Sequence, residues 1–596
     1  MVRLFLLWST LGAALAASIG DDQQFIQYHV VANPQADGKL GVTVDQDIYP
    51  LEADPNVPLL YSGRAPGGKE YRYVTLGAAD EILDTETFDR PAMYEAKDTY
   101  NEVYGRPWNK IFLPELPQLY DFDSRNKAPL IGSSNQTVKD PAKNDLFEDG
   151  TIATIHITAD EEDIQAMHAN KMDKKAARMD GKLTFISYKD IRQIDNVEIK
   201  VGGHSSREWA KVPYKINIPD TDENGLYRRW ELKLRSESTD PTMMREKIYN
   251  DLLKATGVQA ARGVYVRLYF NDTPVGLYYL VDDPGAATYV QETMKPENGT
   301  SAEGTLIQGD AGKGLYAANF AFRGENEADY DDKVYKVEVD TTQPGEPSAM
   351  ERLIQFNKFI ADYDPDAYPN ASDPSALAVW EKEIDIFRYL KQLAVEWIGG
   401  NWDAVQYSGN NFALYYHPAM QRYVMLPMDF DYTFGNGLEE DQRGLLTGHW
   451  RDFTQNRKVH SFIFEKLKRT PSMVALYESI QKQINDHVSN PDVLLPRVDG
   501  LTYMLQRDIV WDQSLERFTV GAQRVWSADN YLQVLEEGSG EADERIGLKE
   551  WIRGKYEAIK DMDNIEPVPV DEELMREEEM EALEQQGQAG LLQDDD

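Results

Sequence analysis

Residues 386–435 read IFRYLKQLAVEWIGGNWDAVQYSGNNFALYYHPAMQRYVMLPMDFDYTFG. Beginning just upstream, Ile384, Phe387, Leu390, Ala394 and Trp397 recur at the spacing of one helix face and predict a buried helix. Two short strand-like runs follow, at 412–416 and 423–426. Polar residues stand where these elements end, as Asn401-Trp402-Asp403, Asn410-Asn411 and Asp429-Phe430-Asp431.

These polar groups suit a hard cation. Mg²⁺ and Mn²⁺ prefer oxygen ligands such as carboxylates and amide carbonyls, and substrate phosphates commonly complete their coordination. Phosphoryl transfer needs such a cation, positive charge and one carboxylate that directs the acceptor hydroxyl. An isolated Asp-x-Asp pair, by contrast, is typical of a turn or an exposed surface.

Outward from this stretch the chain is first β-rich and then α-rich. Short strand-like runs between turn residues, such as 25–31 and 71–76, predict a small β-sandwich over residues 18–145. From 150 to 565 we expect one α+β catalytic domain with two lobes. Its first part carries predicted strands at 151–157, 196–201, 214–218 and 265–270 and a helix at 241–255, which Asp240 is placed to cap.

Three blocks of sequence resemble the CotH family, which includes spore-coat protein kinases of bacteria and cell-surface proteins of fungi. The segment from Asp403 to Asn411, followed by 425–435, is similar to the catalytic signature of that family. The other two blocks are residues 234–246, which include Leu234-Arg235, Asp240-Pro241-Thr242 and Arg245-Glu246, and residues 265–283. With Lys211 and Trp511-Asp512 the resemblance covers most of residues 150–560.

The resemblance implies a two-lobed, atypical protein-kinase-like core that binds ATP and Mg²⁺ or Mn²⁺. Asp403 matches the catalytic carboxylate, and Asn411, Asp429 and Asp431 match the metal ligands. Lys211 matches the lysine that neutralises the ATP phosphates, and Glu246 is the candidate helix residue that holds this lysine. Val281 and Asp282 fall where the hinge between the lobes meets adenine.

The sequence departs from ordinary protein kinases in three respects. Asn411 follows Asp403 by eight residues, a longer spacing than usual, and a His-Arg-Asp triplet and a Gly-x-Gly-x-x-Gly loop are absent. Residues 202–206, Gly-Gly-His-Ser-Ser, offer backbone amides and hydroxyls to phosphates instead. Lys215 is an alternative phosphate ligand, on the same strand face as Lys211 unless Pro213 interrupts the strand.

The N-terminus indicates export. Arg3, an apolar run at 4–15 and a small-residue cleavage site predict a signal peptide over residues 1–17, which is short for a membrane anchor. Four Asn-x-Ser/Thr sequons begin at Asn135, Asn271, Asn298 and Asn370. The chain has no cysteine, so its core must be stable without disulfides. We expect a secreted or cell-surface glycoprotein without a transmembrane segment.

The net charge of −40 argues against nucleic-acid binding, because phosphates would be repelled. Part of this charge lies in residues 566–596, which we predict to be a disordered, solvated tail.

Two functions remain open. The first is an ATP- and metal-dependent kinase that phosphorylates Ser or Thr of proteins in the secretory pathway, coat or cell wall. The alternative is a non-catalytic surface adhesin that binds a host or wall ligand. A glycoside hydrolase is a third, weaker hypothesis, because it leaves Lys211 and Asn411 without a role.

Overall fold

The computed structural model describes residues 24–34, 38–94, 96–119, 145–294, 304–311, 317–438, 442, 444–454, 461–523, 528–538 and 546–564. The predicted signal peptide and acidic tail lie outside these residues, as do the sequons at Asn135 and Asn298. The side-chain amide of Asn271 donates to the carbonyl oxygen of Ala159 at 2.9 Å, whereas Asn370 is exposed.

The N-terminal domain is a single seven-stranded sheet that folds over one apolar core. Its strand order is β6-β5-β2-β3-β4-β1-β7. The two predicted strands are confirmed as β1 and β5, and the rings of Tyr28 and Tyr71 meet at 4.8 Å inside the core. The strands are β1 (Phe25–Val31), β2 (Lys39–Val44), β3 (Asp47–Ala53), β4 (Leu60–Pro66), β5 (Tyr71–Leu76), β6 (Ile82–Thr85) and β7 (Asp98–Val103).

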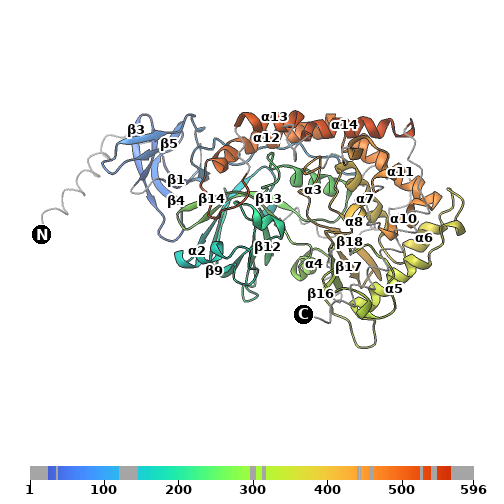
Figure 1. Ribbon diagram of the computed structural model, residues 1–596. Coiled ribbons are helices and arrows are strands. Elements are labelled where there is room, and N and C mark those ends of the chain that lie inside the picture. Colours follow the sequence, from blue (N-terminus) through green and yellow to red (C-terminus); the bar gives the residue numbers. More distant parts are fainter. Residues whose placement is uncertain are drawn as a thin grey trace, which may run out of the picture.

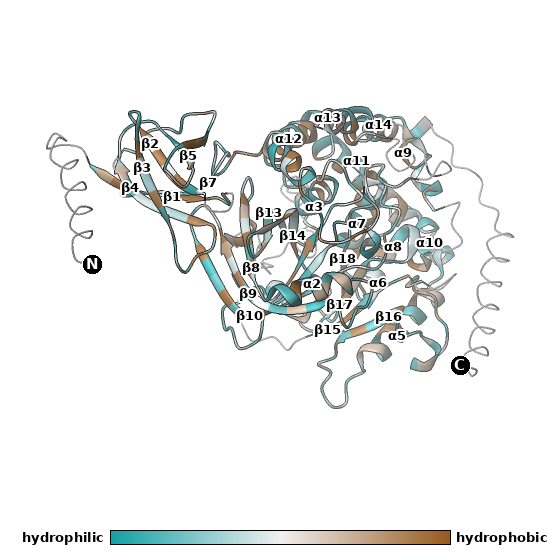
Figure 2. Ribbon diagram, turned by 60° about the vertical axis from the view of Figure 1, so that its left-hand side comes forward, coloured by the Kyte–Doolittle hydropathy of each residue, from teal (hydrophilic) through white to brown (hydrophobic). Residues whose placement is uncertain are grey.

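A closed seven-stranded barrel follows, in the order β10-β11-β12-β14-β13-β8-β9. Helix α2 (Glu161–Ala169) follows the first strand and begins directly after Asp160. Alternate residues fill the barrel with apolar side chains, and hydrophobic and hydrophilic segments both occur along β9 and β10 in Figure 2. The strands are β8 (Ile152–Thr158), β9 (Arg178–Ile186), β10 (Ile191–Val201), β11 (Tyr214–Asn217), β12 (Glu231–Arg235), β13 (Gly263–Phe270) and β14 (Thr273–Asp282).

Helix α3 (Arg245–Thr256) begins later than predicted. The Asp240 carboxylate still accepts hydrogen bonds from the N–H groups of Met244 and Arg245, at 3.0 and 2.9 Å. Asp240 therefore satisfies the free donors of the first turn from a preceding loop. Pro241 lies in that loop rather than in the helix.

The C-terminal part is helical around a four-stranded sheet of order β16-β15-β17-β18. Its strands are β15 (Thr305–Gly309), β16 (Tyr335–Val339), β17 (Phe412–His417) and β18 (Arg422–Pro427). The described helices are α4 (Ala287–Thr293), α5 (Ala349–Asp362), α6 (Ser375–Trp380), α7 (Ile386–Gly399), α8 (Val405–Ser408), α9 (Gly444–Thr447), α10 (Phe462–Lys468), α11 (Pro471–His487), α12 (Pro491–Gln513), α13 (Ala528–Glu537) and α14 (Leu548–Lys560).

The helix predicted in the central stretch is α7, and it is buried on nearly all sides. Leu390, Ala394 and Trp397 lie in the main core as predicted, while Phe387 is half-buried at its edge and Ile384 precedes the helix. A helix that is buried on nearly all sides belongs in the centre of a large domain. The mixed α and β composition is thus confirmed, and the barrel and the helical part have separate cores.

Helices α12, α13 and α14 extend along one side of the molecule and connect its parts (Figure 1). Asp508 of α12 binds Arg106, which follows the N-terminal sheet, at 2.7 Å, and Arg267 of the barrel at 2.6 Å. No helix among the described residues is long and apolar enough to cross a membrane.

Candidate functional site

The hairpin of β17 and β18 brings the predicted metal ligands together. Phe412 pairs with Pro427, and the N–H of Met428 donates to the carbonyl of Asn411 at 2.9 Å. Asn411 and Asp429 therefore lie side by side at the open end of the hairpin. Both residues have a positive φ, 57° and 59°, a left-handed conformation that Asn and Asp adopt more readily than other non-glycine residues.

Asp403 reaches the same place from the other direction. Helix α7 ends at Gly399, and Gly400, with φ of 58°, turns the chain back toward the hairpin. The carboxylate of Asp403 accepts one hydrogen bond from the Asn410 side chain and one from the Asn411 side chain, both at 3.0 Å. The two amides fix its orientation.

Burial raises the pKa of the Asp403 carboxyl to about 6. The negative charges of Asp429 and Asp310 act in the same direction, whereas the hydrogen bonds from Asn410 and Asn411 oppose them. A carboxylate with a raised pKa is suited to accept a proton near neutral pH.

Asp429 and Asp431 both lie next to the guanidinium group of Arg235. The guanidinium of Arg235, on β12, donates to both carboxylate oxygens of Asp429, in one case at 2.9 Å. The same group lies 3.5 Å from Asp431. Burial disfavours the charge of Asp429, but Arg235 outweighs this effect and lowers its pKa. Burial and the neighbouring charge of Asp429 raise the pKa of Asp431 well above its usual range.

The donor set fits Mg²⁺ or Mn²⁺. The adjacent carboxylates of Asp429 and Asp431 repel each other, so a bound cation would stabilise both. The side-chain nitrogen of Asn411 donates to Asp403, which leaves the side-chain oxygen of Asn411 as the atom that can serve as a ligand. Among the described residues no group of three or more His, Asp or Glu side chains is placed to hold a metal ion by itself. Water and phosphate oxygens would have to complete the coordination, as is usual for Mg²⁺.

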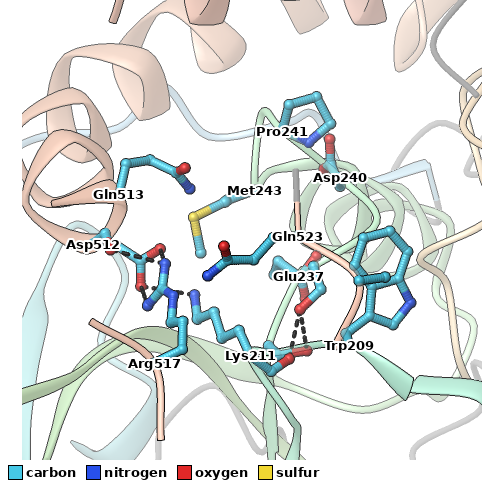
Figure 3. Close-up of a pocket in the computed structure, with 13 residues that line it drawn as sticks. Trp209, Lys211, Glu237, Asp240, Pro241, Met243, Asp512, Gln513, Arg517 and Gln523 are labelled. Carbon is cyan, nitrogen blue, oxygen red and sulfur yellow. Dashed lines mark hydrogen bonds and ion pairs between the residues drawn. The ribbon is translucent and has the colours of Figure 1, made fainter. Parts of the chain in front are cut away.

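Lys211 does not join this group. Its ammonium lies 2.9 Å from Asp512 and donates to the carbonyl of Leu277 at 2.6 Å, in a separate pocket shown in Figure 3. The predicted pairing of Lys211 with Glu246 is wrong, because Glu246 instead accepts from Nε of Arg235 at 2.9 Å. Strand alternation and a bend in the chain explain why Glu246 pairs with Arg235 and not with Lys211. Arg235 faces outward from a regular strand toward α3, whereas Lys211 precedes β11 and turns toward α12.

Lys215 lies on β11 opposite Lys233 on β12. Both alternate with apolar residues that fill the barrel, so both ammonium groups point outward, and both bind Asp283, at 3.1 and 2.8 Å. Asp283 also borders the helical part of the protein. Gly285 lies between the two: a Cβ atom added to it would be 3.4 Å from Asp283 Oδ1 and 3.5 Å from the sulfur of Met428, which directly precedes Asp429. The lysine pair therefore faces the junction beside Asp429.

Val281 and Asp282 end strand β14 and are both buried. The carboxylate of Asp282 accepts from Arg229 at 2.5 Å, and its N–H donates to the carbonyl of Arg262 at 2.9 Å. The N–H and Oδ1 of Asp282 are therefore engaged within the protein, whereas Oδ2 is buried without a hydrogen-bond partner among the described residues. The register of β14 turns the Asp282 side chain into the barrel end and leaves Asp283 at the junction. The adenine role of Val281 and Asp282 stays a prediction.

Sequence reasoning assigned no role to Arg235, Asn410, Lys233 or Asp283. The alternation of apolar and charged residues in Glu231-Leu232-Lys233-Leu234-Arg235 could have indicated that three charged side chains share one face. Residues 202–206 lead into a short 3-10 helix, Ser205–Glu208 (η4), and the His204 ring contacts Lys174 at 2.9 Å.

Comparison with known proteins gives one family and several relatives. Residues 199–552, more than half of the chain, match a family model described as CotH kinase protein. Invasin CotH3 of Rhizopus delemar is 27% identical over 91% of this chain and 85% of its own length, and Invasin CotH2 of the same fungus is 25% identical over 90% and 82%. The inner spore coat protein H of Bacillus subtilis is 21% identical over 48% of this chain and 77% of its own length.

Proposed function

Since the chain belongs to the CotH kinase protein family, we propose that it is a secreted protein kinase. It transfers the γ-phosphoryl group of ATP to Ser or Thr hydroxyls of secreted, coat or wall proteins, and it requires Mg²⁺ or Mn²⁺. One observation carries this proposal: Asp403, Asn411, Asp429 and Asp431 meet at one hairpin end beside Arg235 and the outward-facing lysines.

The side chains divide the work by their chemistry. Asp403, oriented by two amides and with a raised pKa, accepts the proton of the acceptor hydroxyl. Arg235 holds Asp429 in place, and Lys215 and Lys233 present positive charge to phosphates. A divalent cation, when bound, supplies neutralisation of the charge on the transferred phosphoryl group.

The decisive experiment combines nucleotide binding with phosphate transfer. Purified protein should gain thermal stability with ATP and Mg²⁺ or Mn²⁺ together, and it should transfer radiolabel from γ-labelled ATP to itself or to secreted proteins. Asp403→Asn should abolish transfer and keep the ATP-dependent thermal shift, while the exposed control Asp366→Asn should change neither. Transfer that survives Asp403→Asn would show that the assignment is wrong.

Surface binding is the second candidate function, and the relatives favour it. The two fungal proteins that match about 90% of this chain are named invasins. A cell-surface or secreted location agrees with these names and with the predicted signal peptide. If binding is the function, wild-type protein and the Asp403→Asn variant should bind the target cells or wall equally well. A loss of binding only in Asp403→Asn would instead link adhesion to catalysis.

A further inference from the structure

The C-terminal end of α7 stands between the two segments that carry the candidate site. Asp403 follows it closely, after the turn at Gly400. The last four carbonyl groups of an α-helix receive no hydrogen bond from within the helix. The donors that they find elsewhere therefore show what holds this end of the helix in place.

Two of these carbonyls in α7 are satisfied by the turn that leads to Asp403. The N–H of Asn401 donates to the carbonyl of Glu396 at 2.8 Å. The N–H of Gly400 donates to the carbonyl of Trp397 at 3.2 Å. Gly400 has a φ of 58°, so this is the common closure of a helix by a left-handed glycine. The turn thus directs the chain toward Asp403 with a fixed geometry.

The other two carbonyls are satisfied by residues that are distant in the sequence. The N–H of Phe434, shortly after Asp431, donates to the carbonyl of Gly399 at 2.6 Å. The indole N–H of Trp551, on α14, donates to the carbonyl of Ile398 at 2.9 Å. The segment that follows Asp431 and helix α14 are therefore fastened to the same helix end.

The ring of Trp551 also occupies the space between the two segments. A Cβ atom added to Gly400 would overlap this ring, and one added to Gly435 would lie 3.2 Å from it. Gly435, like Gly400, has a positive φ, of 85°. Gly400 precedes Asp403 and Gly435 follows Asp431, so one indole ring lies against both turns and sets their separation.

Trp551 is itself held firmly. Its side chain is fully buried, and Lys555, one turn further along α14, lies 5.3 Å from its ring centre. The chain just before α14 is fixed as well. Ile546 lies against Gly435, and its carbonyl accepts from the guanidinium of Arg245 on α3 at 3.3 Å. The indole is therefore a rigid spacer between the two turns.

We propose that Trp551 is a positioning residue for phosphoryl transfer, which holds Asp403 and the segment 429–431 at the separation that the reaction needs. This inference rests on the proposed kinase function. Catalytic geometry tolerates little error, because a misplacement of about 1 Å can cost about a hundredfold in rate. Trp551 lies behind the two turns and acts only through them, so its loss should lower kcat and leave ATP binding nearly unchanged.

The test compares Trp551→Phe with Trp380→Phe in the full-length protein. Trp380 is also fully buried, and it packs against Phe359 and Tyr363. Trp551→Phe should lower kcat about tenfold or more and change the KM for ATP less than about twofold. Trp380→Phe should leave both constants within about twofold of wild type. A wild-type kcat in Trp551→Phe, or an equal loss of kcat in both variants, would overturn the proposal.

Hydrogen exchange followed by mass spectrometry gives a second readout that does not depend on activity. Peptides that cover residues 398–404 and 431–437 should exchange about tenfold faster in Trp551→Phe than in wild type, and Trp380→Phe should not change them. If the wild-type protein transfers no phosphate, the proposed function is wrong, whereas faster exchange in both peptides would still show that Trp551 holds the two turns. Unchanged exchange would overturn the positioning role whatever the activity.

Gly400→Ala tests the same contact if Trp551→Phe does not fold. The added methyl group would displace the indole ring, so this variant should show the same loss of kcat and the same faster exchange. Gly345→Ala is the matched control, because Gly345 also has a positive φ, of 93°, and an added Cβ atom would meet nothing within 4 Å. If Gly400→Ala behaves as Gly345→Ala does, Trp551 does not position the site.

Discussion

Arg235 of β12 holds the carboxylate of Asp429 through both of its terminal nitrogens, although the two residues are 194 positions apart in the chain. The same guanidinium binds Glu246 of α3 through Nε. One side chain thus ties a barrel strand, the helix that follows it and the loop after β18 into a single unit.

Removal of this arginine should destabilise the protein. Arg235→Met leaves Asp429, Asp431 and Glu246 without their cation, and we expect the free energy of unfolding to fall by about 3 kcal/mol. Mg²⁺ or Mn²⁺ should recover part of this loss, because it replaces the missing charge. Denaturant unfolding with and without metal measures both effects. Arg228→Met, which breaks the exposed pair with Glu292, is the matched control and should cost less than about 1 kcal/mol.

Kinetic measurements can distinguish the roles of Lys215, Lys233 and Lys211. Lys215→Met and Lys233→Met should each raise the KM for ATP about tenfold, because each removes a positive charge that faces the junction. Lys211→Met should mainly reduce stability, because it breaks the buried pair with Asp512. Should Lys211→Met alone raise the KM for ATP, Lys211 would be the phosphate ligand after all.

Asp431 should respond to metal and to mutation in opposite ways. Burial and the charge of Asp429 already disfavour the ionised form of Asp431, so the metal-free Asp431→Asn variant should be at least as stable as wild type. The same change removes a predicted ligand, and the thermal shift produced by Mn²⁺ should shrink. Thermal unfolding with increasing metal measures both quantities. A variant with an undiminished Mn²⁺ shift would exclude Asp431 as a ligand.

Lys555 of α14 should make stability depend on pH. Its ammonium donates to the carbonyl of Leu445 and lies over Trp397 and Trp551, 4.5 and 5.3 Å from the ring centres. Burial lowers its pKa from 10.5 to about 7. Between pH 7 and 10.5 the unfolded chain therefore binds a proton that the folded protein does not, and stability rises with pH over this window.

The difference in free energy of unfolding between wild type and Lys555→Met isolates this contribution. It should change by up to about 1.4 kcal/mol per pH unit between pH 7 and 9. Urea unfolding at several pH values measures it. Lys560→Met, at an exposed position of the same helix, should give no such slope. A difference that is independent of pH would mean that Lys555 stays charged when folded.

Local pattern was sufficient for much of the fold. Strand-like runs between turn residues identified β1 and β5, alternation identified β8, and helical spacing identified α7, because these patterns depend on residues a few positions apart. The start of α3 was misplaced, since Asp240 satisfies the first helical N–H groups from a loop instead of from the capping position. That geometry depends on Arg245, whose buried guanidinium holds the same carboxylate.

The amino-acid sequence by itself determined that Asp403, Asn411, Asp429 and Asp431 would meet, because a buried helix and a short hairpin carry them within 28 positions of one another. Only the tertiary structure decided which cation faces these carboxylates. Closure of the barrel sets the register of β12 against β14, and that register points Arg235 at Asp429 while Lys211 turns to Asp512. Long-range pairing of this kind follows from packing between distant segments, which no local pattern encodes.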